Sequence, residues 1–203
     1  MNAASSPLLW LASRSPRRGE LLEQLGVRFA RIDVEVDESC LDAEAPADYV
    51  RRVALLKAAT PRADGDERVI LAADTCVSVG GEIFGKPRDF TDAKRMLRCL
   101  SGRWHTVYTA VVLSAPQAPP EVAAVATRVE FVILDDALIA AYWGSGEPAD
   151  KAGAYGIQGL GGALVRGIEG SYSAVVGLPL AETRALLDGA GVRHALSGGL
   201  SQS

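Results

Sequence analysis

Residues 105–114 (HTVYTAVVLS) and 122–134 (VAAVATRVEFVIL) are two long β-forming segments that follow each other in the chain. Residues 115–120 (APQAPP), which separate them, predict a hairpin loop or the tip of a lobe. Strands joined by so short a connection pair antiparallel, because parallel neighbours need a long crossover. The two segments therefore predict that at least part of the sheet is antiparallel.

Outward from this hairpin, strand and helix patterns alternate along the chain. Further strands are expected at 8–12, 29–36, 69–79 (interrupted by Asp74 and Thr75), 82–84 and 163–166. Helices are expected at 16–25, 46–59, 91–100, 135–143 and 179–187. Ser15 is the expected N-cap of the first helix, with Pro16 at its first position, and Thr91 is the expected cap of the third. The alternation predicts an α/β fold whose mixed sheet is flanked by helices.

The composition is that of a globular protein, since 48% of the 203 residues are hydrophobic and 23% are charged, which leaves room for a core. We expect one domain over residues 1–203, with a core at about 8–190 and frayed ends at 1–6 and 197–203. The three cysteines show neither metal-ligand spacing nor a disulfide framework, which fits a reducing cytosol. No apolar run approaches the length of a membrane-spanning helix, and no targeting segment is visible.

Residues 147–159 (EPADKAGAYGIQG) combine acids, a lysine, a glutamine and several glycines. The stretch fits neither an alternating strand nor an amphipathic helix. Glycine lets the backbone turn with positive φ or approach a ligand closely. Lys151 supplies positive charge, and Gln158 supplies an amide that both donates and accepts. Taken alone, the stretch is better explained as a tight connector. Together with the motifs below, it predicts a surface loop that holds a small, polar, anionic molecule.

Residues 13–18 (SRSPRR) lie between an expected strand and the start of an expected helix. The free N–H groups and the dipole of a helix N-terminus favour an anion, and arginine has forked donors that suit phosphate oxygens. The alternative is an ordinary capped helix with solvated arginines, which explains this segment equally well.

Asp74 comes directly after four apolar residues, so it is expected at the end of a buried strand. Ligand sites in open α/β sheets gather at the carboxyl ends of strands, and a buried aspartate needs a partner. The alternative is an aspartate that caps a helix or forms a turn. Residues 34–38 (VEVDE) place Glu38 at another expected strand end. The carboxylates of Glu38 and Asp74 would suit a hard cation such as Mg²⁺ or Mn²⁺.

Residues 80–86 (GGEIFGK) match the glycine and lysine spacing of a phosphate-binding loop. The motif then needs serine or threonine to hold Mg²⁺, but Pro87 occupies that position, and Gly80 and Gly81 predict a hairpin turn. We therefore reject an ATPase loop and keep Lys86 as a phosphate-binding candidate. His105, one of two histidines, is expected to be a structural hydrogen-bonding residue and not a base.

The motifs occur in one order over about residues 8–187: LASRSPRR (11–18), DE (37–38), AADT (72–75), GKP (85–87), LSG (100–102), HTVYT (105–109), EPADKAGAYGIQG (147–159) and VGLPL (176–180). In this order the chain resembles the Maf family of nucleoside triphosphate pyrophosphatases, also called septum formation inhibitor proteins. It is similar to the branch that acts on dTTP and UTP, not to the branch that acts on 7-methyl-GTP.

The resemblance implies hydrolysis of a nucleoside triphosphate to the monophosphate and pyrophosphate with a divalent metal, Mg²⁺ or Mn²⁺, in nucleotide-pool sanitation. It implies an elongated mixed sheet like that of inosine triphosphatases, with a nucleotide cleft between two lobes. Asp74 becomes the proton acceptor that activates water, and Glu38 and Asp74 become metal ligands. The implied phosphate contacts are Ser13, Arg18, Lys57 and Lys86. The implied determinants of base choice are Arg17, Thr75 and Gln158.

The resemblance also implies a homodimer. From the composition we expect a cytoplasmic protein with no nucleic-acid or membrane partner. A different class of function is a nucleotide-binding regulator of cell division that acts through a protein partner. Binding needs only cations, whereas hydrolysis also needs a metal and a base, so the presence of both Glu38 and Asp74 favours an enzyme. A nucleic-acid binder is disfavoured by the net charge of −4 and the 6% aromatic content.

Overall fold

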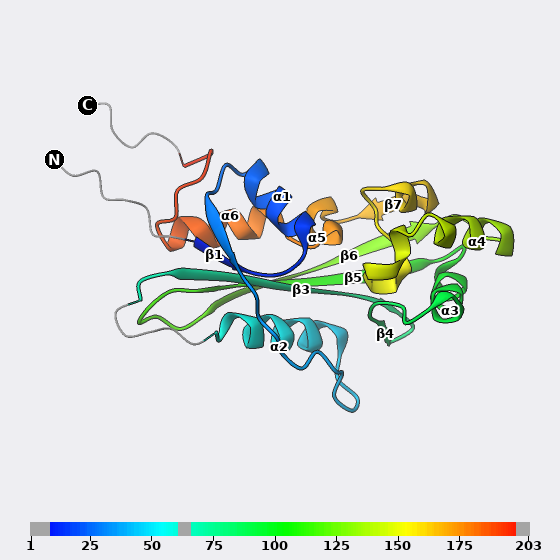
Figure 1. Ribbon diagram of the computed structural model, residues 1–203, viewed down its shortest axis with the longest axis horizontal. Helices are drawn as coiled ribbons and strands as arrows, with labels where there is room; N and C mark the ends of the chain where they lie inside the picture. The colour runs from blue at the N-terminus through cyan, green and yellow to red at the C-terminus, as the bar shows by residue number, and fades with distance from the viewer. Residues whose placement is uncertain (1–8, 61–65, 198–203) are drawn as a thin grey trace.

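The computed structural model describes residues 9–60 and 66–197, and its centre is one seven-stranded sheet (Figure 1). The strand order is β2-β1-β3-β5-β6-β7, and β4 pairs with β3. β1 runs parallel to β2 and β3, and the other pairs are antiparallel, so the predicted mixed sheet is confirmed. The strands are β1 (Leu9–Ala12), β2 (Phe29–Ile32), β3 (Val69–Val79), β4 (Glu82–Phe84), β5 (Trp104–Ser114), β6 (Glu121–Phe131) and β7 (Val165–Glu169).

The helices cover both faces of the sheet and one of its ends. In Figure 1, α1, α5 and α6 lie on one face, α2 lies on the other, and α3 and α4 lie at the far end of the long strands. The helices are α1 (Pro16–Gln24), α2 (Pro46–Ala58), α3 (Phe90–Leu100), α4 (Asp136–Gly144), α5 (Tyr172–Val176) and α6 (Leu180–Gly189), with 3₁₀ turns η1 (Glu147–Asp150), η2 (Ala152–Ala154) and η3 (Leu160–Leu164). None of the described helices is long and apolar enough to cross a membrane.

β3 separates two hydrophobic cores because successive side chains of a strand point to opposite faces. Leu71 and Ala73 pack in the core that contains leucines of α1 and α6. Ile70, Ala72 and Cys76 pack in the core that contains valines of α2. The even-numbered residues of β3 therefore face α2, whereas Leu71 and Ala73 face α1 and Val77 packs in a third core with residues of α3 and α4. This alternation decides where the two polar residues in the middle of the strand point.

One edge of β3 is open at its centre. β5 pairs with β3 along the whole of residues 70–78, so β1 and β4 share the opposite edge. β1 covers residues 69–72 of that edge and β4 covers residues 77–79. Within the described part of the chain, residues 73–76 have no strand on this side. The gap contains Asp74 and Thr75, and the chain leaving β1 turns into α1 beside it.

Several predicted boundaries and one predicted cap were wrong. β3 is not interrupted at Asp74 and Thr75, because β5 pairs with both residues. β2 ends at Ile32 and β6 at Phe131, each before its predicted end. Thr91 does not cap α3, since the carboxylate of Asp89 accepts the N–H of Asp92 at 2.8 Å.

Other differences concern caps and short elements. Pro16 begins α1 as predicted, but the side chain of Ser15 makes no capping bond. The region predicted as a strand at 163–166 begins as the end of η3, and β7 starts at Val165. α5 was missed because it is only one turn long and contains two valines, which favour strands. The ends predicted to be frayed lie outside the described residues, apart from Ser197.

Candidate functional site

A cavity of about 250 Å³ opens beside the gap in the edge of β3. Its walls come from the β1–α1 turn, the segment before α2, α2 itself, β3, the segment after β4, the glycine-rich loop and the end of α5. All the site residues predicted from the sequence line it: Ser13, Arg17, Arg18, Glu38, Lys57, Asp74, Thr75, Lys86 and Gln158. The fold thus brings together residues that are up to 145 positions apart, between Ser13 and Gln158.

Asp74 projects toward α2 and meets Lys57 near the end of that helix. The Lys57 ammonium lies 2.8 Å from Asp74 Oδ1 and 2.8 Å from Glu38 Oε1. Asp74 is only 5% exposed, and its Oδ2 has no hydrogen-bond partner among the described residues. Burial raises the pKa of Asp74 and outweighs the opposing charges of Lys57 and Arg18. Asp74 is therefore inside a strand, not at its end as predicted, and the strand that ends beside it is β1.

Glu38 is in an irregular segment that follows β2 and precedes α2, and not at a strand end as predicted. Its side chain is 51% exposed, and the Tyr49 hydroxyl donates to its backbone carbonyl at 2.9 Å. Partial burial acts to raise the pKa of Glu38. The hydrogen bond from Lys57 and the charges of Lys57, Lys86 and Arg18 have a larger effect in the opposite direction, so the pKa is lowered overall. Glu38 thus presents an ionised carboxylate at the cavity.

Thr75 projects to the other face of β3 and meets Arg18 of α1. The Arg18 guanidinium donates to Thr75 Oγ1 at 3.2 Å, to Ser13 Oγ at 3.1 Å and to the Gly177 carbonyl at 2.8 Å. Burial lowers the pKa of Arg18, against the charge of Asp74. The alternative of solvated arginines in this segment is therefore wrong for Arg18, although Arg14 is exposed.

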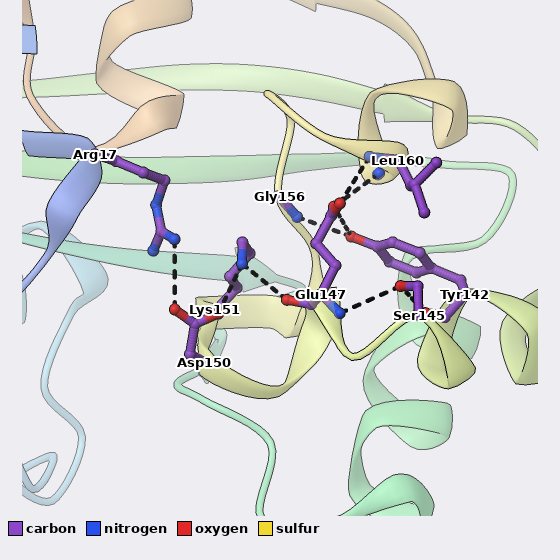
Figure 2. A network of polar contacts seen from close by, with 9 residues as sticks. Arg17, Tyr142, Ser145, Glu147, Asp150, Lys151, Gly156 and Leu160 are labelled. Atoms are coloured by element: carbon purple, nitrogen blue, oxygen red, sulfur yellow. Dashed lines mark hydrogen bonds and ion pairs between the residues drawn. The ribbon is translucent and has the colours of Figure 1, made fainter. Parts of the chain in front are cut away.

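The glycine-rich loop contains η1 and η2, leads into η3 and carries its own charge pairing (Figure 2). Lys151 Nζ donates to the Glu147 carbonyl at 2.8 Å and to Asp150 Oδ1 at 2.7 Å. Its charge is paired with Asp150 inside the loop, although Lys151 also lines the cavity. Arg17 Nη1 approaches Asp150 Oδ2 at 3.5 Å from across the cavity. Gln158 is exposed where it lines the cavity.

Two further predictions concern Gly80, Gly81 and His105, which do not line the cavity. Gly80 and Gly81 both have positive φ in the β3–β4 hairpin turn, which confirms the turn and leaves Lys86 exposed after β4. His105 is buried, and its Nε2 hydrogen-bonds the Tyr155 hydroxyl at 2.8 Å. Burial lowers the pKa of His105 to about 4, so the ring is neutral near pH 7. The prediction of a structural histidine is confirmed.

Comparison with known proteins decides the family of the chain. Residues 8–190 match the family described as Maf-like protein. The chain belongs to the Maf family. A relative from Hahella chejuensis is 52% identical over 188 residues, which cover 91% of this chain and 93% of the relative. One from Anaeromyxobacter dehalogenans strain 2CP-C is 56% identical over 189 residues, covering 92% and 95%. Both relatives are named dTTP/UTP pyrophosphatase.

Among solved structures, a HAM1 protein from Coxiella burnetii is 16% identical with a TM-score of 0.49, covering 90% of this chain and 99% of that one.

The carboxylates of this Maf family member fit a hard cation. Glu38 Oε1 and Asp74 Oδ1 share one ammonium at 2.8 Å each, so the two oxygens lie within twice that distance of each other. Asp74 Oδ2 is buried with its lone pairs unused. In the part of the chain that is described, no group of three histidine, cysteine or acidic residues forms a cage. Mg²⁺ typically binds one or two carboxylates and completes its shell with water and substrate phosphates, so a pair of carboxylates suffices.

Three residues at the Maf site were missed by sequence reasoning. Thr109 of β5 hydrogen-bonds Thr75 Oγ1 at 3.0 Å and donates to the Ala174 carbonyl at 2.7 Å, which fixes the Thr75 side chain. Tyr155 lines the cavity, and its hydroxyl hydrogen-bonds His105. Tyr142 of α4 organises the glycine-rich loop through hydrogen bonds. Thr109 and Tyr155 lie inside quoted motifs, but Tyr142 precedes its motif and has no local signal.

Proposed function

We propose that the protein is a nucleoside triphosphate pyrophosphatase that hydrolyses dTTP and UTP to the monophosphate and pyrophosphate. The observation that carries the proposal is the Lys57–Asp74–Glu38 cluster, where a buried aspartate keeps one oxygen unbonded beside a cavity lined with cations. The names of relatives that are 52% and 56% identical give the reaction and the substrates.

Asp74 is our candidate for the general base. A base must accept a proton from water at the pH of the reaction, and catalysis is most effective when its pKa lies near that pH. Burial moves the pKa of Asp74 upward, in the required direction. Its Oδ2 is the oxygen available for a water molecule, because Oδ1 already accepts from Lys57.

Charge neutralisation is the larger task in cleaving between the α and β phosphorus atoms, since the protein supplies little covalent chemistry there. We assign phosphate contacts to Ser13, Arg18, Lys57 and Lys86. Ser13 and Arg18 hydrogen-bond each other and present one surface on the α1 side of β3. Lys57 and the exposed Lys86 line the cavity together with Glu38. Arg18 is anchored by three acceptors, so its charge stays fixed as a ligand binds.

Glu38 and Asp74 would hold the divalent cation, Mg²⁺ or Mn²⁺. Such an ion supplies positive charge for the phosphate oxygens and a template that orients the substrate. Lys57 lies between the same carboxylates, and its charge favours their ionised forms and holds them close together. We assign base choice to Arg17, Thr75 and Gln158, which lie on different walls of the cavity. Gln158 suits a pyrimidine edge because its amide can pair with both a carbonyl and an N–H.

The test is a panel of dTTP, UTP, CTP, GTP and 7-methyl-GTP with Mg²⁺ or Mn²⁺, assayed for both pyrophosphate and inorganic phosphate. We expect pyrophosphate as the product, with dTTP and UTP as the preferred substrates. Preference for 7-methyl-GTP, or release of phosphate alone, would contradict the proposal. Binding of dTTP without turnover would favour the alternative, a nucleotide-binding regulator of cell division. We also propose that the enzyme is a homodimer, which sedimentation of the purified protein tests. We place it in the cytoplasm, which fractionation of the cells tests.

A further inference from the structure

Both carboxylate oxygens of Glu147 accept hydrogen bonds within and beside the glycine-rich loop (Figure 2). Its Oε1 accepts the Tyr142 hydroxyl at 2.7 Å and the Gly161 N–H at 2.9 Å. Its Oε2 accepts the Leu160 N–H at 2.8 Å. Partial burial acts to raise the pKa of Glu147. These hydrogen bonds and the charge of Lys151 have a larger effect in the opposite direction, so the pKa is lowered overall and the carboxylate is ionised. One side chain therefore holds two consecutive backbone N–H groups.

The same carboxylate also reaches the other end of the segment through Tyr142. The Tyr142 hydroxyl donates to Glu147 and accepts the Gly156 N–H at 3.0 Å. Gly156 and Leu160 are the residues on either side of Ile157, Gln158 and Gly159. Both flanks of Gln158 are thus fixed to one acidic group. In contrast, the chain of contacts to Arg17 does not use the Glu147 carboxylate. It runs from the Glu147 backbone carbonyl through Lys151 and Asp150.

The glycines of the segment allow this arrangement. A Cβ atom at Gly159 would overlap the Glu147 carboxylate. A Cβ atom at Gly161 would overlap the Tyr142 hydroxyl and lie 2.6 Å from the Gly156 carbonyl oxygen. These glycines let backbone approach a carboxylate and other backbone of the protein. The sequence predicted that glycines here let the backbone approach a ligand closely. At Gly159 and Gly161, the close contacts are instead with residues of the protein.

We propose that Glu147 is a positioning residue for base selection, because its carboxylate fixes residues 156–161 and so places Gln158 at the cavity. The inference rests on the proposed dTTP and UTP pyrophosphatase activity and deepens it. Glu147 acts through Gln158 and does not touch the substrate. Tyr142 is its partner in the same role.

Glu147→Gln tests the inference with almost no change in size. A glutamine amide offers one acceptor oxygen and one NH₂ donor group. If the NH₂ group takes the place of Oε2, it faces the Leu160 N–H. If the NH₂ group takes the place of Oε1, it faces the Gly161 N–H and the Tyr142 hydroxyl. In either orientation a donor meets a donor, so the segment shifts. Tyr142→Phe is the second variant, since it removes the acceptor of Gly156 and a donor to Glu147 while keeping the ring.

The measurement is kcat/KM for dTTP, UTP, CTP and GTP in a double-mutant cycle with Gln158→Ala. We expect Glu147→Gln to reduce the preference for dTTP and UTP several-fold, and to add almost nothing when Gln158 is already alanine. Hydrogen exchange of the Leu160 and Gly161 amides should become faster. An unchanged substrate ratio, or an effect on the ratio that adds fully to that of Gln158→Ala, overturns the inference. If Glu147→Gln does not fold, the same measurements on Tyr142→Phe decide.

The controls separate this inference from the proposed function. Glu169→Gln removes an exposed carboxylate that pairs with Arg128 at 2.5 Å, and Tyr172→Phe removes an exposed hydroxyl; neither should change the substrate ratio. If the unsubstituted protein does not hydrolyse dTTP or UTP, the proposed function fails. If it does, and the variants keep its base preference, only the role of Glu147 fails.

Discussion

Asp74 lines the cavity, whereas Glu147 lies in the glycine-rich loop that forms one of its walls, and the two carboxylates have opposite surroundings. Asp74 has one oxygen bonded to Lys57 and the other buried without a partner in the described chain. Glu147 accepts three hydrogen bonds that engage both its oxygens. Burial raises the pKa of Asp74, whereas the hydrogen bonds of Glu147 outweigh its partial burial and lower its pKa.

The difference shows how the surroundings of an acid indicate its use. A buried acceptor left unbonded costs about 1–3 kcal/mol, so the fold tolerates a loss at Asp74 that it avoids at Glu147. A group with unused acceptor capacity can receive a proton or a cation. A group whose lone pairs are directed at backbone N–H groups holds a loop in shape. Asp74 is therefore assigned to chemistry and Glu147 to architecture.

Removal of the metal should have the largest effect on the Asp74 side of the comparison. Activity on dTTP should vanish in excess EDTA and return with Mg²⁺ or Mn²⁺, because Glu38 and Asp74 are hard oxygen ligands. The loop held by Glu147 uses no such ion, so thermal unfolding followed in the same samples serves as the control. Full turnover in excess EDTA would show that the two carboxylates do not hold a required metal.

Asp74→Asn should have the next largest effect. The substitution keeps the shape of the side chain but removes the base and one metal charge, and loss of a general base typically lowers the rate about 10²–10⁴-fold. Turnover is compared with that of Asp136→Asn, in which the lost carboxylate is exposed and pairs with Lys94 and Arg98. Near-normal kcat in Asp74→Asn would refute its assignment as the base.

Gly161→Ala tests the Glu147 side by pushing a methyl group into the packed loop. We expect a loss of about 1–3 kcal/mol of stability, as for other overpacked sites. In a chain of this size each kcal/mol lowers Tm by about 2–4 °C, which calorimetry can measure. Gly144→Ala is the matched control, because a Cβ atom at Gly144 meets nothing within 4 Å. Equal Tm values for the two variants would show that Gly161 is not closely packed.

Gln158→Ala should have the smallest effect. Losing one hydrogen bond to the base is worth about 0.5–1.5 kcal/mol, so preference for dTTP and UTP over purine triphosphates should fall several-fold. Metal binding should be unchanged, since a hard cation prefers the carboxylates of Glu38 and Asp74 and both remain. Gln24→Ala, at an exposed glutamine of α1, is the control for kcat/KM ratios. Ratios that stay constant in Gln158→Ala would exclude it from base choice.

Sequence patterns predicted the mixed sheet, and the resemblance to the Maf family predicted the residues that line the cavity. Neither predicted the contacts that distinguish the two carboxylates. The hairpin between β5 and β6 and the start of α1 at Pro16 are local features, so periodicity and turn residues sufficed. The place of Asp74 inside β3 depends on pairing with β5, and the reach of Tyr142 to Gly156 depends on how α4 packs. Such contacts join distant residues, and the sequence alone carries no spacing rule for them.

The open edge of β3 also has a consequence for folding kinetics. β1 pairs with β3 from Leu9↔Val69 to Ala12↔Ala72, so the turn that carries Ser13 reaches Asp74 only after about 60 residues of chain have closed into a loop. Pairings between residues so distant in sequence are typical of slowly folding topologies. On refolding from denaturant, we therefore expect helical signal to return before hydrolysis does, since the nucleotide cavity is complete only when this long-range ladder has formed.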